Sequence, residues 1–344
     1  MEINKQLNLE SLTGQVVLIT GATGLIGKNL IHTLVSNNNL KLFMKPIKII
    51  ALVRSLEKAQ RILKEDYDAI ECVVGDIEKR ILISGQVDYI VHAASQTSSK
   101  AFIEQPISTI NTAVVGTTNI LELAREKKVK KVVYLSTMEV YGSPSTDEKI
   151  NEMHGTNLDQ MLVRSCYPES KRICENLCVA YMKEYDIPIN VIRLTQTFGQ
   201  GVDYNDGRVF AEFARCVIER RDIVLHTKGE TRRNYLYTQD AVNAILTVLI
   251  KGKSGEAYNA ANEDTYCSIY DMAQMVAKRC AHGEIKVRIE IEDESKYGFA
   301  PVLKMNLDAT KLKSLGWEAA VGLEDMFHIL IQDMRTNKHE DWYN

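Results

Sequence analysis

A short apolar run, Gln15 to Thr20, leads without a break into the glycine-rich sequence GATGLIG at residues 21–27. The run is rich in β-branched residues and predicts a buried strand, and residues 27–35 predict a helix. A strand, a tight turn and a helix in this order place the turn at the carboxyl end of a sheet strand. No other feature of the chain restricts its fold as strongly.

The alternation of strand and helix continues through the first half of the chain. Further strands are predicted at residues 47–53, 71–74, 88–92, 131–136 and 189–194, and helices at 111–127 and 167–185. Strands separated by helices predict right-handed βαβ units and a parallel sheet covered on both faces. The sequence therefore predicts an α/β fold, with a Rossmann-type doubly wound parallel sheet over residues 1–194.

The second half of the chain is less regular. Helices are predicted at residues 209–220, 240–250, 268–280, 308–315 and 323–334, and a short strand at 223–226. We expect residues 195–344 to form a smaller α/β C-terminal substrate-binding lobe. A return segment near residues 235–262 is expected to rejoin the large sheet.

The glycine turn predicts a dinucleotide site. Gly21 permits the tight turn, Gly24 allows the backbone to approach a pyrophosphate, and Gly27 lets the helix pack close to the sheet. The helix N-terminus then offers free N–H groups and a partial positive charge to the phosphates. The turn residues Thr23, Leu25 and Ile26 are expected to contact the same ligand, although a glycine turn without any ligand is the alternative.

The ends of the next strands bear on which nicotinamide cofactor is bound. The second strand ends at Val53 with Arg54 after it and no acid, so Arg54 could pair with a 2′-phosphate. We therefore favour NADP over NAD; the alternative is that Arg54 stacks on adenine or points to solvent and the cofactor is NAD. Later strand ends provide further predicted cofactor contacts: Asp76, Ile77, Ala93, Ala94 and Ser95.

A tyrosine and a lysine four residues apart open the long helix at residues 167–185, after a strand that ends in Thr137. Tyr167 and Lys171 then share one helix face. An ammonium beside a phenol, next to a positively charged nicotinamide ring, favours phenolate. Tyr167 could then take the proton of a sugar hydroxyl that Thr137 also binds, while hydride leaves for the nicotinamide.

These residues resemble the extended short-chain dehydrogenase/reductase family, the nucleotide-sugar epimerases and dehydratases. Within it the chain is most similar to UDP-glucuronate decarboxylases, in ST-x-EVYG at 136–142, SKR at 170–172, QTFG at 196–199 and NDGRV at 205–209. The resemblance implies that Thr137, Tyr167 and Lys171 are the catalytic triad. It further implies that Asn111 supports the active-site region and the cofactor, and that Arg233 binds substrate phosphate.

The chain departs from the family pattern at several positions. Members that dehydrate at C4–C6 carry Asp-Glu after the threonine, where this chain has Met138 and Glu139. Methionine donates no proton, so dehydration by that route is disfavoured, whereas Glu139 could act at C5 or position a hydroxyl. Gln196 replaces a frequent asparagine. Predicted substrate contacts are Ser95, Thr137, Met138, Gln196, Arg208 and Arg233.

Three classes of function remain open. The first modifies a nucleoside-diphosphate sugar through transient C4 oxidation, as an epimerase or a UDP-glucuronate decarboxylase-like enzyme; a 4,6-dehydratase is a disfavoured variant of it. The second is a net NADP-dependent ketosugar reductase or sugar C4 oxidase. The third is a non-catalytic protein that binds dinucleotide as a sensor. The sugar and the nucleotide base are left open.

Composition limits the remaining possibilities. The net charge is −3 without a dense Lys/Arg block, which disfavours nucleic-acid binding. Neither a membrane-spanning run nor a secretory signal is recognised, and seven cysteines without CxxC spacing suit a reducing cytoplasm. Cys174 and Cys178 are expected in the core, and no metal site is predicted. The resemblance further implies a homodimer formed by helices 111–127 and 167–185.

Overall fold

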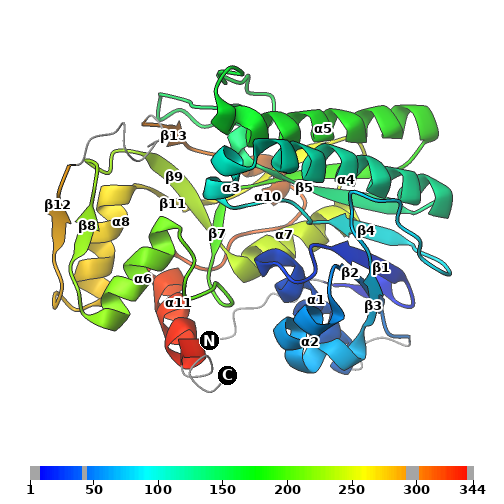
Figure 1. The fold of residues 1–344 in the computed structure, drawn as a ribbon, viewed down its shortest axis with the longest axis horizontal. Helices are drawn as coiled ribbons and strands as arrows, with labels where there is room; N and C mark the ends of the chain where they lie inside the picture. Colours follow the sequence, from blue (N-terminus) through cyan, green and yellow to red (C-terminus); the bar gives the residue numbers. More distant parts are fainter. Residues whose placement is uncertain (1–7, 41–44, 292–301, 339–344) are drawn as a thin grey trace.

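The computed structural model describes residues 8–40, 45–291 and 302–338. A large parallel sheet with helices on both faces forms one lobe, and shorter strands and helices form a smaller lobe beside it (Figure 1). Both lobes bear on the candidate site, because residues predicted to contact substrate lie in each of them.

The large sheet has seven parallel strands in the order β10-β6-β5-β4-β1-β2-β3. Its strands are β1 (Val16–Thr20), β2 (Lys48–Val53), β3 (Glu71–Val74), β4 (Tyr89–His92), β5 (Lys131–Thr137), β6 (Ile189–Leu194) and β10 (Ala257–Ala260). The chain starts at the centre and winds first to one edge and then to the other, so the predicted doubly wound α/β fold is confirmed.

The helices around this sheet are α1 (Leu25–Asn39), α2 (Leu56–Leu63), α3 (Ser99–Glu104), α4 (Pro106–Lys127), α5 (Cys166–Tyr185), α7 (Thr238–Lys251) and α10 (Thr310–Lys313). Helix α4 begins five residues earlier than the predicted Asn111, because Pro106 occupies its first turn. Helix α1 continues to Asn39, beyond the predicted end at Val35.

Two apolar cores lie on opposite faces of the large sheet. Along β1, Val17 and Ile19 join the core that contains α1 and α7, whereas Leu18 joins the core that contains α4 and α5. This alternation follows from the period of two in a strand. Cys174 and Cys178 are buried in the second core, as expected from the sequence.

The smaller lobe is built on β7 (Gln196–Phe198), β8 (Ile223–Leu225), β9 (Arg232–Tyr237), β11 (Asn262–Ser268), β12 (Val287–Ile289) and β13 (Lys304–Met305). Its helices are α6 (Val209–Glu219), α8 (Ile269–Met275) with a following π turn η5 (Val276–Cys280), and α11 (Leu323–Lys338). Strand β9 pairs with β7, β11 and β13, and β8 pairs with β12. Of these strands the sequence predicted only β8.

The segment at residues 235–262 divides between the two lobes. Strand β10 joins the large sheet beside β6, whereas β9 and β11 pair antiparallel to each other in the smaller lobe. The chain therefore crosses between the lobes after β9 and again before β11. The boundary at residue 194 stays a prediction.

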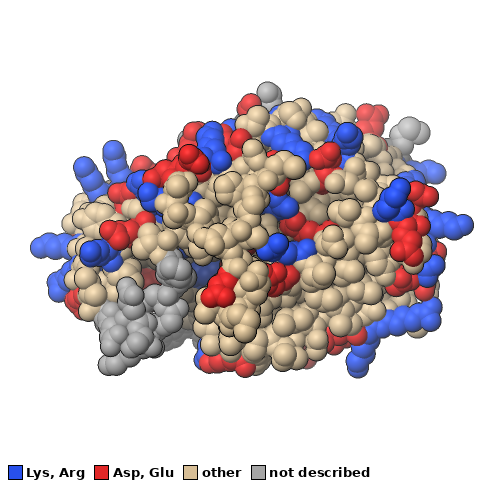
Figure 2. Space-filling model, turned by 90° about the horizontal axis from the view of Figure 1, so that it is seen from above, with Lys and Arg blue, Asp and Glu red and all other residues tan. Residues whose placement is uncertain are grey.

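Charged residues of both signs are interspersed over the face seen in Figure 2, and neither sign forms a continuous patch there. In the described ranges, each helix is either too short or too polar to cross a bilayer.

Candidate active site

Side chains join the carboxyl ends of the adjacent inner strands β1 and β4 of the large sheet. The Thr20 hydroxyl lies 2.7 Å from His92 Nδ1, and it accepts a hydrogen bond of 3.1 Å from the Ala94 N–H. Thr117 Oγ1, on α4, lies 3.2 Å from His92 Nε2. These contacts hold the segment after β4 against the turn that follows β1.

The glycine turn requires its glycines. Gly21 has φ +66°, and a Cβ there would lie 2.7 Å from the Ala93 carbonyl carbon. A Cβ on Gly27 would lie 2.2 Å from the Gly21 oxygen. Gly24 is exposed, and a Cβ there would meet only the Gly21 oxygen at 3.2 Å, so this side of the turn is open to a ligand.

The start of α1 suits the phosphates of a dinucleotide. Gly24 is its N-cap and provides no side chain to bond the first N–H groups, which belong to Leu25, Ile26 and Gly27. Such groups bind anions at a helix N-terminus. Thr23 is half-buried in the same turn. The residues present therefore fit the dinucleotide that the sequence predicts.

The other predicted cofactor contacts differ in exposure. Arg54 and Asp76 are exposed after β2 and β3, and Asp76 accepts a hydrogen bond of 3.0 Å from the Glu78 N–H. Ile77 packs against Gly116 of α4, and a Cβ added to Gly116 would lie 2.7 Å from the Cδ1 atom of Ile77. Ser95 is half-buried after β4. Asn111 lies on the exposed side of α4.

Tyr167 and Lys171 both lie on the buried face of α5, next to the end of β5. The Lys171 ammonium is 6.0 Å from the centre of the Tyr167 ring and donates a hydrogen bond of 2.7 Å to the Leu135 carbonyl. Tyr167 shares a side-chain hydrogen bond with Thr137 at the end of β5. The structure therefore brings the three predicted catalytic residues together.

Burial opposes ionisation of both groups. It raises the pKa of the Tyr167 phenol, and the Glu139 carboxylate raises this pKa further, whereas Thr137 and Arg164 lower it. Burial also lowers the pKa of Lys171 to about 8. The sequence led us to expect that Lys171 would lower the phenol pKa. In the structure the groups that lower this pKa are Thr137 and Arg164, and burial outweighs them, so the pKa is raised.

Met138 and Glu139 follow Thr137 but differ in surroundings. Met138 is buried in a cluster with Val140 and Tyr141, and its sulfur lies 3.3 Å from the Thr195 hydroxyl. Glu139 is half-buried and forms a 2.9 Å ion pair with Arg164. Glu139 thus lies near the phenol, whereas the Met138 side chain belongs to a core.

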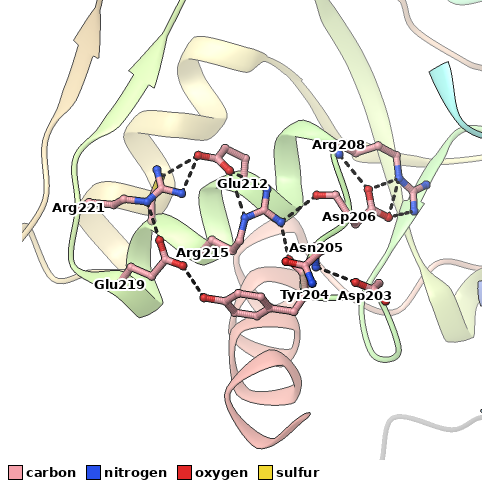
Figure 3. A network of polar contacts seen from close by, with 10 residues as sticks. Asp203, Tyr204, Asn205, Asp206, Arg208, Glu212, Arg215, Glu219 and Arg221 are labelled. Atoms are coloured by element: carbon pink, nitrogen blue, oxygen red, sulfur yellow. Dashed lines mark hydrogen bonds and ion pairs between the residues drawn. The ribbon is translucent and has the colours of Figure 1, made fainter. Parts of the chain in front are cut away.

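The predicted phosphate-binding arginines have different partners. Arg233 lies on β9, opposite Cys267 of β11 and Met305 of β13, and its buried Nε has no hydrogen-bond partner among the described residues. Arg208, before α6, forms a two-pronged ion pair with Asp206, with Nη2–Oδ2 at 2.6 Å and Nε–Oδ1 at 3.0 Å (Figure 3). Arg233 is therefore available to bind an anion, whereas Arg208 is already paired with the Asp206 carboxylate.

Three further residues bear on the site and were missed in the sequence. Phe102 of α3 stacks on the Tyr167 ring, Arg164 pairs with Glu139, and Lys28 of α1 donates to the Gly201 carbonyl at 2.6 Å. Arg164 stands three residues before Tyr167 and could have been found from that spacing. The positions of Phe102 and Gly201 depend on chain segments far apart in sequence.

His92 predicts a loss of stability in mild acid. Burial, with the nearby Lys171 charge, lowers its pKa from 6.5 to about 3. Below pH 6.5 the His92 imidazole therefore binds a proton in the unfolded chain but not in the folded chain, so the free energy of unfolding falls as the pH falls. Between pH 6.5 and 5, above most carboxyl titrations, the free energy of unfolding is expected to drop by about 2 kcal/mol.

Urea denaturation at several pH values measures this drop, and the His92→Asn variant removes the titrating group. The variant is expected to be less stable throughout but to show a flatter pH dependence between pH 6.5 and 5. Equal slopes in the variant and the unaltered protein would contradict the assignment to His92.

Comparisons with known proteins extend over most of the chain. The family model described as "NAD dependent epimerase/dehydratase family" matches residues 17–261. UDP-glucuronic acid decarboxylase 1 of Xenopus tropicalis is 29% identical over 312 residues, which are 90% of this chain and 69% of that protein. UDP-glucuronic acid decarboxylase 5 of Arabidopsis thaliana is 28% identical, over 93% of this chain and 89% of that protein.

Solved structures share the fold. UDP-glucose 4-epimerase of Thermotoga maritima, solved with UDP-glucose, has a TM-score of 0.79 at 22% identity, covering 94% of this chain and 100% of that one. The dTDP-glucose 4,6-dehydratase of Bacillus anthracis, in complex with NAD, has a TM-score of 0.75 at 22% identity, covering 94% of this chain and 98% of that one.

Proposed function

Because the chain belongs to the NAD-dependent epimerase/dehydratase family, we propose that it modifies a nucleoside-diphosphate sugar through transient oxidation at C4. We further propose that the sugar is a uronate and that the net reaction is decarboxylation. The observation that carries the proposal is the meeting of Thr137, Tyr167 and Lys171 at the end of β5, in the same parallel sheet as the strand that leads into the glycine turn. The similarity to UDP-glucuronic acid decarboxylases over most of the chain supports the choice of sugar.

The protein's own residues would perform the proton transfer. When bound, the dinucleotide supplies a hydride acceptor and a positive charge near the phenol. Tyr167 would take the proton of the C4 hydroxyl, Thr137 would hydrogen-bond that oxygen, and Lys171 would keep a positive charge within reach of the ring. Because the Lys171 pKa stays at about 8 while burial raises that of Tyr167, the ammonium is charged at neutral pH and the phenol is neutral until it transfers its proton, and the positive charge then favours the phenolate.

A ketone at C4 makes a C6 carboxylate a β-keto acid, which loses CO2 readily. Arg233, whose buried Nε has no partner within the part of the chain that the structure describes, would bind the pyrophosphate. Arg208 would also bind it while its guanidinium stays paired with Asp206. Glu139 would position a sugar hydroxyl or act at C5. Met138 is buried and has no proton to donate, so dehydration through an acid at this position is disfavoured.

A second candidate is a net oxidoreductase that exchanges its cofactor in each turnover. Arg54, exposed after β2 in place of an acid, favours NADP and hence this alternative. Comparing the affinities of the protein for NAD and NADP tests the cofactor preference. Tight retention of a dinucleotide through purification would support the self-contained cycle, and a requirement for added NADPH would support the oxidoreductase.

The decisive experiment incubates the purified protein with UDP-, CDP-, GDP- and dTDP-linked sugars, including UDP-glucuronate, and follows product masses. A loss of about 44 mass units from a uronate supports decarboxylation, and a loss of about 18 from a hexose would contradict the interpretation of Met138. Unchanged substrates, together with tight dinucleotide binding, would favour a non-catalytic sensor. The Tyr167→Phe variant is the matched control.

We also propose a homodimer through α4 and α5. An apolar groove of about 520 Å³ runs between these helices and residues 160–166, and its lining includes Ile110, Met161 and Ile173. Ile107, on the same helix as Ile110, is 68% exposed, and Met161 is 90% exposed. An apolar surface of this kind suits a second copy of the chain. Leu177 and Tyr181, also on α5, are partly buried against the core that contains α4 and α5.

The Ile173→Glu variant is expected to convert the dimer to a monomer, because a carboxylate would be buried without a partner in the interface. Light scattering after gel filtration measures the mass. Ile289→Glu is the matched control, since both isoleucines are 46% exposed and Ile289 lies in the smaller lobe. A monomeric unaltered protein, or a dimer in both variants, would contradict this interface.

A further inference from the structure

Arg164 contacts two residues that surround the Tyr167 phenol. It lies in a single helical turn, η4 (Val163–Ser165), directly before α5. Its Nη2 is 2.9 Å from Glu139 Oε2, and its guanidinium carbon is 4.6 Å from the centre of the Phe102 ring. One side chain therefore joins the segment after β5 to helix α3.

The Phe102 ring transmits this contact to the tyrosine. Its centre is 4.3 Å from that of the Tyr167 ring, with only 10° between the two planes. Phe102 is 2% exposed, and its carbonyl accepts a hydrogen bond of 3.2 Å from the Cys166 thiol. Arg164, Phe102 and Tyr167 thus form a continuous stack, in which a cation lies on one aromatic ring and that ring lies on the next.

The electrostatics of the stack complement its geometry. The charged or titratable side chains that act on the Tyr167 phenol, or lie against its ring, are Glu139, Arg164, Lys171 and Tyr134. Glu139 raises the phenol pKa and Arg164 lowers it. Because Arg164 is paired to Glu139, it offsets the carboxylate that adds to the effect of burial in opposing ionisation of the phenol.

We propose that Arg164 is a positioning residue of the active site, which orients Glu139 with its forked guanidinium and holds the Tyr167 ring in place through Phe102. The planar guanidinium makes both contacts at once, whereas an ammonium can pair with the carboxylate but cannot stack on the ring in the same way. This inference rests on the proposed function, since it assigns Arg164 to the proton transfer by Tyr167.

The test uses the full-length protein and the nucleotide-sugar that the unaltered protein turns over. Arg164→Gln is expected to lower kcat about 10- to 100-fold with KM changed less than about 3-fold, because small displacements of a reacting group cost this much. Its kinetic pKa for the tyrosine should move upward, since Glu139 is then uncompensated. Glu139→Gln in the same chain should return that pKa toward its original value.

The conservative variant separates charge from geometry. Arg164→Lys is expected to restore the kinetic pKa but not the full kcat, because it keeps the charge and loses the planar stack. Arg172→Gln is the matched control: Arg172 lies on α5, 3.6 Å from Glu169, with 37% of its side chain exposed against 35% for Arg164. Its kcat and pH profile should be unchanged.

Several outcomes would overturn the inference. They are an unchanged pH profile in Arg164→Gln, additive losses in the Arg164→Gln/Glu139→Gln double variant, or full kcat in Arg164→Lys. Far-ultraviolet circular dichroism excludes unfolding as the cause of any loss. An unaltered protein that turns over no nucleotide-sugar would contradict the proposed function itself, and active but unaffected variants would contradict only the role of Arg164.

Discussion

Replacing Tyr167 with phenylalanine is expected to lower kcat by about three orders of magnitude while the protein stays folded and binds its dinucleotide. The variant removes one oxygen, the group that would accept the C4 hydroxyl proton. The ring itself should stay in place, because its stacking on Phe102 involves no hydroxyl. Rates of product formation and a dinucleotide titration, measured on the same preparation, check both halves of the expectation.

Tyr134 provides a matched control for this substitution. It is 1% exposed on β5, and among the described residues its buried hydroxyl has only the weakly bonding Cys174 thiol beside it. Tyr134→Phe should therefore leave kcat within about 2-fold and leave stability unchanged or slightly higher, since it removes an unsatisfied polar group. Comparable losses of activity in both variants would mean that Tyr167 contributes through packing and not through its hydroxyl.

Replacing Lys171 with methionine is expected to change activity and stability in opposite directions. Burial lowers the Lys171 pKa from 10.5 to about 8, which corresponds to a cost of roughly 3 kcal/mol for holding the ammonium in the folded protein at neutral pH. Loss of its hydrogen bond to the Leu135 carbonyl offsets part of the gain. We expect kcat to fall at least about 100-fold and the free energy of unfolding to rise by about 1–2 kcal/mol at pH 7.

The pH dependence identifies the source of the added stability. A base whose folded pKa is depressed costs the fold most below that pKa, and the cost fades as the pH rises toward the unfolded value. The stability advantage of Lys171→Met should therefore shrink between pH 8 and 10.5. Chemical denaturation of both proteins across this range measures it, and a variant less stable than the unaltered protein at pH 7 would refute the buried-charge explanation.

Much of the larger lobe could be predicted from local patterns. The parallel strands are nearly continuous apolar runs because both of their faces are buried, so each is visible in a few consecutive residues. The short strands β7 and β13, by contrast, have two or three residues and contain Gln196 and Lys304. They exist because β9 offers them backbone hydrogen bonds, and no local apolar pattern marks them.

The same contrast applies to the candidate site. Gly21, Gly24 and Gly27 are recognisable because a turn with a positive φ angle and a close helix contact requires glycine at fixed spacing. Tyr167 and Lys171 are recognisable because residues four apart in a helix share a face. Both signals depend on distances of a few residues along the chain.

The amino-acid sequence by itself determined the order of strands and helices around the glycine turn and the pairing of Tyr167 with Lys171, because backbone geometry imposes both over short distances. Only the tertiary structure decided that Phe102 stacks on Tyr167, that Arg164 forms an ion pair with Glu139, and that Arg208 forms one with Asp206. The first two of these contacts join segments 65 and 25 residues apart in the chain, so side-chain packing selects the partner. The third joins residues two apart and depends on the conformation of their loop, in which Asp206 also accepts a hydrogen bond from the Arg208 N–H.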